Sequence, residues 1–249
     1  MFTIDYRSRV RDYAIAQANA DVRVVAGAVV GSLANSEADR WSDLDLTFGV
    51  ADGVPIGEVL EDFSASLADE FDATRLFDLP SGAAIYRVFL LPGCLQFDLS
   101  VAPASQFGAI GPDFKLLFGQ AVTRPHAPPP EAQQMLGYAV HHALRARFCI
   151  ERGRSWQAEY WISGVRDYAL SLACRRRGLP AHYGRGFDAL PDAVRQSAIA
   201  ALVRSPDRNE LLRALRCTIE LLMAETDEVR ELATRVQPQM ERLIAGVLE

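Results

Sequence analysis

Residues 24–50 read VVAGAVVGSLANSEADRWSDLDLTFGV, and this stretch decides the architecture of the first half of the chain. A valine-rich run ends at Gly31-Ser32, a polar connection follows, and Ser42-Asp43-Leu44-Asp45-Leu46 opens a second apolar run. The pattern predicts two strands, over 23–30 and 43–50. Because side chains at i and i+2 of a strand share one face, the two aspartates should point the same way, away from the core.

Paired carboxylates on a strand suggest a metal site. An Asp-x-Asp by itself is more often a solvated outer face. Two such charges held side by side repel unless a cation lies between them, and Mg²⁺ takes oxygen ligands together with substrate phosphates. Gly31 lets backbone N–H groups approach a phosphate, and the Ser32 hydroxyl is a further donor. The stretch LQFDLSV over 95–101 alternates as a strand should, and it places Asp98 on a polar face. Three aspartates and a phosphate-sized turn therefore predict a Mg²⁺ and phosphate site.

In these residues the chain resembles the DNA polymerase β-type nucleotidyltransferase superfamily. The shared pattern is an apolar strand, Gly31-Ser32, a polar connection, Asp43-Leu44-Asp45 and a later strand aspartate, Asp98. The proportions are similar to the small-molecule branch, which acts on aminoglycosides and lincosamides. Beyond the motif the resemblance is architectural. One departure is visible: many relatives carry Arg-Gly where this chain has Asn35-Ser36, and Arg40 is the candidate to replace that arginine.

The resemblance implies a Mg²⁺-dependent enzyme that moves a nucleoside monophosphate, AMP from ATP or another nucleotide, onto a hydroxyl of a small molecule. An antibiotic is one such acceptor. Asp43 and Asp45 would hold the metal, and Gly31 and Ser32 would seat the β- and γ-phosphates. Asp98 would complete the metal site, act as general base, or do both. The alternatives are transfer to a protein hydroxyl, an inactive nucleotide-binding or scaffold protein, and an unrelated α+β protein with a chance motif.

Charge and composition limit the kinds of partner that the chain is expected to bind. The chain has 249 residues, 49% of them hydrophobic, and a net charge of −6. Residues 1–125 carry a net charge of −8 and residues 126–249 a net charge of +2. An acidic half repels a phosphate backbone, which disfavours nucleic acid as a partner. The sequence shows neither a membrane span nor a signal peptide, so a soluble cytoplasmic protein is expected. The four cysteines lack metal-site spacing. The oligomeric state is left open.

The order of elements predicts an α+β fold with two domains. Residues 1–124 alternate helices, at 5–20 and 55–69, with strands that also include 71–78, 83–91, 94–102 and 115–118. The proline-dense residues 125–130 form a predicted linker. Residues 131–249 have helical periodicity throughout, which predicts an all-α substrate-binding bundle. Its helices are expected at 131–152, 156–177 after a Ser155 cap, 191–203, 207–225 and 227–247.

Two arginines of the second domain are further candidates for nucleotide or acceptor contacts. Arg166 lies on a predicted helix, where it would turn to the triphosphate or pair with Glu159. Arg185 lies in the glycine-flanked loop HYGRGFD at 182–188, and loops of this kind often contact ligands. The common glycine-rich nucleotide fingerprints are missing from the sequence.

Overall fold

The computed structural model describes residues 1–35, 38–125 and 131–245. The chain divides into two compact units, Met1–Ala127 and Pro128–Glu249, called here the sheet unit and the helical unit. The predicted linker falls, except for residue 125, outside the described residues. In the described ranges, no helix is long and apolar enough to cross a membrane.

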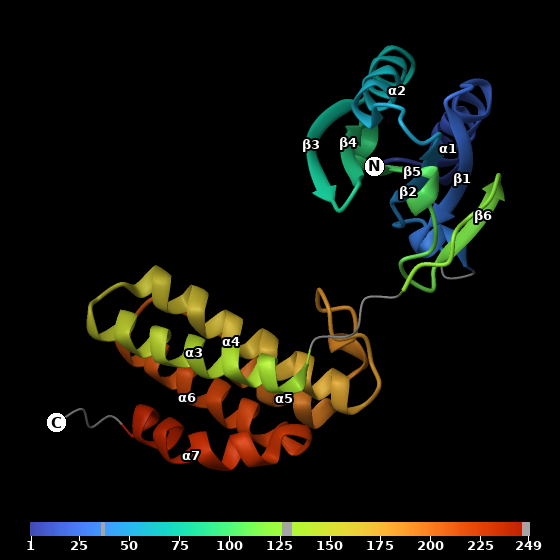
Figure 1. The fold of residues 1–249 in the computed structure, drawn as a ribbon. Helices are drawn as coiled ribbons and strands as arrows, with labels where there is room; N and C mark the ends of the chain where they lie inside the picture. The colour runs from blue at the N-terminus through green and yellow to red at the C-terminus, as the bar shows by residue number, and fades with distance from the viewer. Residues whose placement is uncertain (36–37, 126–130, 246–249) are drawn as a thin grey trace. The chain divides into compact units, whose positions relative to one another are not determined.

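The sheet unit holds one mixed sheet with two long helices (Figure 1). Its strands are arranged in the order β3-β4-β5-β2-β1-β6. The only parallel pair among these strands is β2 with β5, and the other neighbours are antiparallel. The elements are α1 Ile4–Ala20, β1 Val24–Val30, η1 Gly31–Ala34, β2 Leu44–Val50, α2 Ile56–Phe71, β3 Thr74–Ser81, β4 Ala84–Leu91, η2 Pro92–Cys94, β5 Leu95–Pro103, η3 Ala104–Gln106 and β6 Phe114–Phe118.

The two faces of this sheet differ in chemistry because the strand residues alternate. Helices α1 and α2 lie on one face, as Figure 1 shows, and bury the apolar side chains of β2 and β5 there. These side chains are Leu44, Leu46, Phe48, Val50, Phe97, Leu99 and Val101. The opposite face carries the polar positions of the same strands, and Phe107 packs there against β1. The chain therefore buries one face of the sheet under helices and leaves its polar positions together on the other.

A buried arginine completes the helix-covered face at β4. Arg87 is 2% exposed and donates to both carboxylate oxygens of Asp78, each at 2.8 Å. It also donates to Ser64 Oγ at 2.8 Å and to Glu61 Oε1 at 2.9 Å, both on α2. The carboxylates offset the cost of burying the guanidinium charge. The network ties α2 to the strands at this end of the sheet.

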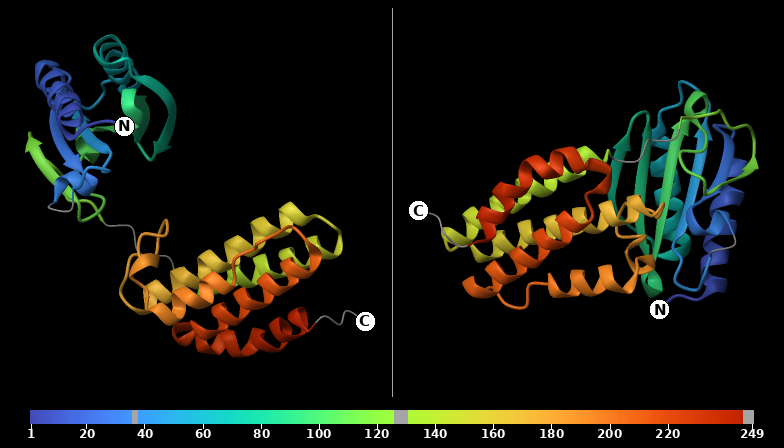
Figure 2. Two further views of the ribbon diagram at one scale, coloured as in Figure 1. Left: turned by 180° about the vertical axis from the view of Figure 1, so that it is seen from behind. Right: turned by 90° about the horizontal axis from the view of Figure 1, so that it is seen from below.

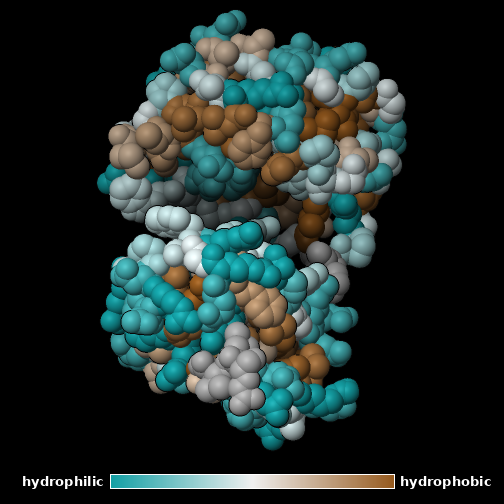
Figure 3. Space-filling model, turned by 90° about the vertical axis from the view of Figure 1, so that its left-hand side faces the viewer, coloured by the Kyte–Doolittle hydropathy of each residue, from teal (hydrophilic) through white to brown (hydrophobic). Residues whose placement is uncertain are grey.

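Apolar side chains of the edge strand β3 remain exposed, namely Leu76, Phe77 and Leu79. In Figure 3, brown hydrophobic areas interrupt the teal hydrophilic surface on the side that is drawn.

The described elements of the helical unit are all helices (Figure 2). They are α3 Ala132–Glu151, α4 Ser155–Arg176, η4 Phe187–Ala189, α5 Asp192–Ala200, α6 Arg208–Ala224, η5 Asp227–Val229 and α7 Arg230–Ile244. Helices α3 and α4 pack along their length through alanines, including Ala139, Ala143, Ala146 and Ala169. Such small side chains let two helix backbones approach closely. Leucines of α6 fill the remaining core, among them Leu211, Leu215 and Leu222.

The α+β fold predicted from the sequence is confirmed, with differences at element ends. Helix α2 continues to Phe71, so β3 begins at Thr74 rather than at residue 71. Ser155 is the first residue of α4 and not its cap, because Arg154 holds the cap position. The last predicted helix, 227–247, is a 3₁₀ turn followed by α7, and its residues 246 and 247 lie outside the described residues.

Candidate active site

Three aspartates meet on the polar face of the sheet. The parallel register pairs Asp45 of β2 with Asp98 of β5, so the two side chains leave neighbouring strands at the same level. Asp43 immediately precedes β2 and is half-buried, as are the other two. One carboxylate oxygen from each residue lies within 4.8 Å of the other two. The strand period and the parallel register together produce this cluster.

The Gly31 turn lies directly against Asp45. Strands β1 and β2 pair Val29 with Leu46, which brings the turn after β1 beside the start of β2. Gly31 has φ of +66°, a conformation that L side chains rarely adopt. A Cβ at this position would lie 2.5 Å from Asp45 Oδ2. Glycine is therefore required both for the backbone conformation and for the close approach of the turn to the carboxylate.

The neighbouring groups define how the turn is held. The Gly31 N–H donates to the Asp113 carbonyl oxygen at 3.1 Å, so it is already bonded within the protein. Ser32 follows in η1 and is half-buried, and its hydroxyl makes no hydrogen bond among the described residues. Asn35 Nδ2 donates to Asp113 Oδ1 at 2.8 Å. The turn is thus fastened to the segment before β6, while the Ser32 hydroxyl has no protein acceptor among the described residues.

The electrostatics of the cluster suit a cation. Burial raises the pKa of Asp98, the Gln96 amide opposes this by donating to Asp98 Oδ1 at 3.0 Å, and the charge of Asp43 raises the pKa further. Negative charges this close together repel one another. A hard divalent cation with oxygen ligands, such as Mg²⁺, matches this donor set and would relieve the repulsion. The residues present therefore fit the metal that the motif implies.

Arg40 lies against the ring of its neighbour Trp41. Its guanidinium carbon lies 4.2 Å from the centroid of the Trp41 ring, which is a cation–π contact. The side chain also lines a hollow formed with residues 2–5, at the start of α1. The proposal that Arg40 substitutes for a phosphate-binding arginine stays a prediction.

Arg166 and Arg185 belong to the helical unit. Arg166 lies on α4 and approaches Asp167 Oδ1 at 3.7 Å, whereas Glu159 instead accepts from Ser163 Oγ at 2.8 Å. Arg185 lies in the connection after α4, and its backbone N–H donates to the His182 carbonyl oxygen at 3.1 Å. Their assignment as ligand contacts also stays a prediction.

A small pocket with both polar and apolar walls lies next to the aspartates on the same face of the sheet, and sequence reasoning missed it. It has a volume of about 120 Å³ and continues along the sheet past Asp45 and Asp98. Its polar lining is Thr47, Tyr86, Ser100 and Asp113, and the rest is Val30, Gly108, Ile110, Gly111 and Phe114. Thr47 and Ser100 each lie two residues beyond an aspartate, so alternation could have found them. Tyr86 joins them only because the antiparallel register pairs it with Ser100.

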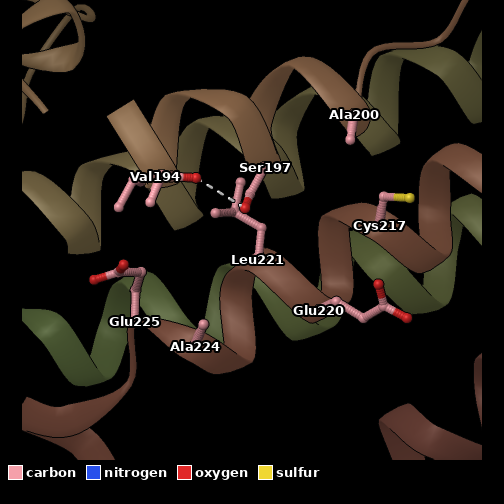
Figure 4. Close-up of a pocket in the computed structure, with 9 residues that line it drawn as sticks. Val194, Ser197, Ala200, Cys217, Glu220, Leu221, Ala224 and Glu225 are labelled. Atoms are coloured by element: carbon pink, nitrogen blue, oxygen red, sulfur yellow. Dashed lines mark hydrogen bonds between the residues drawn. The ribbon is translucent and has the colours of Figure 1, made fainter. Parts of the chain in front are cut away.

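A larger pocket, of about 360 Å³, lies within the helical unit between α5 and α6 (Figure 4). Its walls are mainly small or apolar side chains, including Ala200, Leu221 and Ala224. The buried Glu225 at its edge is bonded to Arg177, with the Arg177 nitrogen 2.7 Å from Glu225 Oε2. The pocket has no cluster of ionisable groups comparable to the three aspartates, as far as the described residues show.

Comparison with known proteins gives little beyond this geometry. No protein-family model and no curated protein matches the chain. One similar solved structure is an aminoglycoside 6-adenyltransferase from Bacillus subtilis, with a TM-score of 0.38 and 11% identity over 98% of this chain and 99% of that one. Another is MenT4, a nucleotidyltransferase toxin from Mycobacterium tuberculosis, with a TM-score of 0.20 and 16% identity over 96% of this chain and 93% of that one. Structural likenesses this weak do not assign a function to the chain.

Proposed function

We propose that the protein is a metal-dependent nucleotidyltransferase that moves a nucleoside monophosphate, AMP from ATP in the first instance, onto a hydroxyl of a small molecule. The observation that carries this proposal is the cluster of Asp43, Asp45 and Asp98 with one oxygen of each within 4.8 Å of the others. The glycine turn pressed against Asp45 adds a place for phosphate beside it. The motif that these residues form in the sequence supports the same assignment.

In this proposal Asp43, Asp45 and Asp98 hold Mg²⁺. The bound metal would neutralise charge on the triphosphate and on the pyrophosphate that leaves. The Ser32 hydroxyl donates to a phosphate oxygen and keeps the triphosphate against the turn. Asp98 accepts the proton of the acceptor hydroxyl, as a ligand that also serves as base. A bond forms between the acceptor oxygen and the α-phosphorus. The bond from the α-phosphorus to the oxygen that bridges it to the β-phosphorus breaks, and pyrophosphate leaves with that oxygen.

The remaining assignments follow as proposals. The helical unit binds the acceptor, Arg40 contacts the triphosphate, and Arg166 and Arg185 contact the nucleotide or the acceptor. Arg40→Gln should then raise the KM for the nucleotide, and Arg166→Gln and Arg185→Gln should each raise the KM for the nucleotide or for the acceptor. For Arg166→Gln and Arg185→Gln the affinity for divalent metal alone should stay at the wild-type level, because both residues belong to the helical unit and the three aspartates to the sheet unit.

Pyrophosphate release tests the proposal. The protein is incubated with Mg²⁺, each of four nucleoside triphosphates, and a panel of aminoglycosides, lincosamides and cell metabolites. Asp43→Asn and Asp45→Asn should each lower turnover more than about 100-fold, since even the outer partners of a metal site cost about 10- to 100-fold. Asp12→Asn, at an exposed position on α1, is the control and should keep wild-type turnover.

Three results would change the proposed function. Wild-type turnover in Asp43→Asn contradicts the metal mechanism. Nucleotide-dependent labelling of proteins in a lysate, with no small acceptor used, moves the acceptor class to protein hydroxyls. Nucleotide and Mg²⁺ binding by calorimetry without any turnover leaves a binding protein rather than an enzyme.

A further inference from the structure

Asp43 differs from its two partners in how its backbone is held. Asp45 and Asp98 lie inside strands and face each other in the parallel register. The first registered pair of β2 and β5 is Leu44 with Phe97, so Asp43 lies just outside the ladder. Backbone pairing alone therefore fixes two of the three carboxylates. The third depends on the segment that precedes β2.

That segment is a tight turn at residues 39–42. Asp39 Oδ1 accepts from the Trp41 backbone N–H at 2.8 Å and from the Ser42 hydroxyl at 3.2 Å. The Asp39 N–H donates in turn to Ser42 Oγ at 3.0 Å. These bonds make the turn a small rigid body directly attached to Asp43. They do not by themselves fasten it to the rest of the sheet unit.

Arg7 of α1 makes that connection. Its side chain is buried, with the residue 5% exposed, although of the two turn residues it contacts Asp39 is exposed and Ser42 half-buried. One nitrogen, Nη1, donates to the Asp39 carbonyl oxygen at 2.9 Å and also to the Ser42 carbonyl oxygen. Both ends of the turn are thus held by one guanidinium. Helix α1 is itself anchored in the core through Val10 and Ala14, so the turn is tied to the most buried part of the unit.

The surroundings of Arg7 suit a residue that holds this turn in place better than one that only stabilises the fold. Within the described part of the chain it forms no ion pair, unlike the similarly buried Arg87, which has two carboxylate partners. The hydrogen bonds of Arg7 go to two carbonyl oxygens, and the Asp39 carboxylate attracts its charge without forming an ion pair, which is a costly way to bury a guanidinium. An arginine is suited to it because its guanidinium presents several donors in fixed geometry, whereas a lysine presents one compact ammonium.

We propose that Arg7 is a positioning residue for the metal site: by holding residues 39–42 it sets where the Asp43 carboxylate lies relative to Asp45 and Asp98. The inference rests on the proposed function, since it assumes that the three aspartates bind a divalent cation. Arg7 itself touches neither metal nor substrate. Removing it should weaken metal binding by about 10- to 100-fold, as is typical when the outer partners of metal ligands are removed.

The test measures Mn²⁺ alone, without nucleotide or acceptor. Free Mn²⁺ is titrated by electron paramagnetic resonance against wild type, Arg7→Lys, Arg7→Met and Asp43→Asn. Arg7→Met should raise the Kd about 10- to 100-fold. Arg7→Lys should fall between Arg7→Met and wild type, because an ammonium group keeps the charge but loses the fixed geometry.

Arg87→Lys is the matched control, a buried arginine of the same unit on the helix-covered face. It should lower the thermal midpoint of unfolding and leave the Kd for Mn²⁺ unchanged. Hydrogen exchange in metal-free protein adds a direct measure of the turn. The amides of Trp41 and Ser42 should exchange faster in Arg7→Met, whereas Arg87→Lys should leave them near the wild-type rate.

Two contrary outcomes are distinct. If wild type binds Mn²⁺ and the folded Arg7 variants bind it equally well, the positioning role is wrong while the proposed function stands. If wild type and Asp43→Asn show the same negligible binding, the metal site itself is wrong and the role of Arg7 falls with it. If Arg7→Met does not fold, Arg7→Lys decides by its Kd.

Discussion

Replacing Gly31 by alanine should weaken metal binding far more than the new contact weakens folding. The new methyl carbon would lie 2.5 Å from Asp45 Oδ2, and real Cβ contacts are essentially never shorter than 3.0 Å. The carboxylate oxygen must therefore move by at least 0.5 Å. It can do so cheaply, because it is the far end of a side chain. This contact should therefore cost the folded protein little stability, but the atom that moves is a proposed metal ligand.

The size of the effect follows from that displacement. Functional groups generally have to be held to within about 0.5 Å, and a misplacement of about 1 Å can cost about 100-fold in rate. Gly31→Ala should accordingly weaken Mn²⁺ binding and lower turnover by about 10- to 100-fold. The left-handed backbone at φ +66° adds a separate loss of stability of about 1 to 2 kcal/mol.

A second glycine provides the control for the backbone cost. Gly82, in the turn between β3 and β4, has φ of +62°, and a Cβ added there would meet no atom of the described residues within 4 Å. Gly82→Ala should lose a similar amount of stability and keep its Mn²⁺ affinity. The assays are urea unfolding without metal, Mn²⁺ titration, and pyrophosphate release. If Gly31→Ala binds Mn²⁺ as tightly as Gly82→Ala, the close approach of the turn to Asp45 has no functional consequence and the reasoning fails.

Three further outcomes are expected. Asp78→Asn should cost about 3 kcal/mol at neutral pH, because it strips the buried Arg87 of its main partner. The pKa of Asp78 is lowered below its ordinary value of 3.8, chiefly by hydrogen bonds from Arg87. The stabilisation that Asp78 gives the folded protein is therefore complete above pH 3.8 and is lost as the pH falls below it. Urea unfolding from pH 7 to pH 2 should show the stabilities of wild type and Asp78→Asn converging in acid. In the helical unit, Gly164→Ala should lower the free energy of unfolding, because its Cβ would lie 2.5 Å from His142 Nδ1, in a ring packed among aromatic neighbours. Gly137→Ala is the control: its Cβ would meet no atom of the described residues within 4 Å, so this variant should gain up to about 1 kcal/mol of stability. Thermal unfolding measures both. Mg²⁺ at about ten times its Kd should raise the free energy of unfolding by about 1.4 kcal/mol, and chelation should reverse the gain.

Local pattern was sufficient for most of the fold. The period of two in residues 43–50 and 95–101 predicts strands with one apolar and one polar face, and helical periodicity predicts the bundle after residue 131. These signals are local because a side chain's direction depends only on its position within its own element. Boundaries were less well determined. Asp43 lies outside β2, because the pairing of β2 with β5 begins only at Leu44 and Phe97.

What the sequence by itself determined about this protein is the α+β order of elements, the aspartates and the glycine turn between two of the strands. It could not determine which strands are neighbours. Only the tertiary structure pairs Asp45 with Asp98, adds Tyr86 to the adjoining pocket, and brings the buried Arg7 to the turn before Asp43. The reason is that register and helix docking depend on contacts between segments far apart in the chain, and no local periodicity records them.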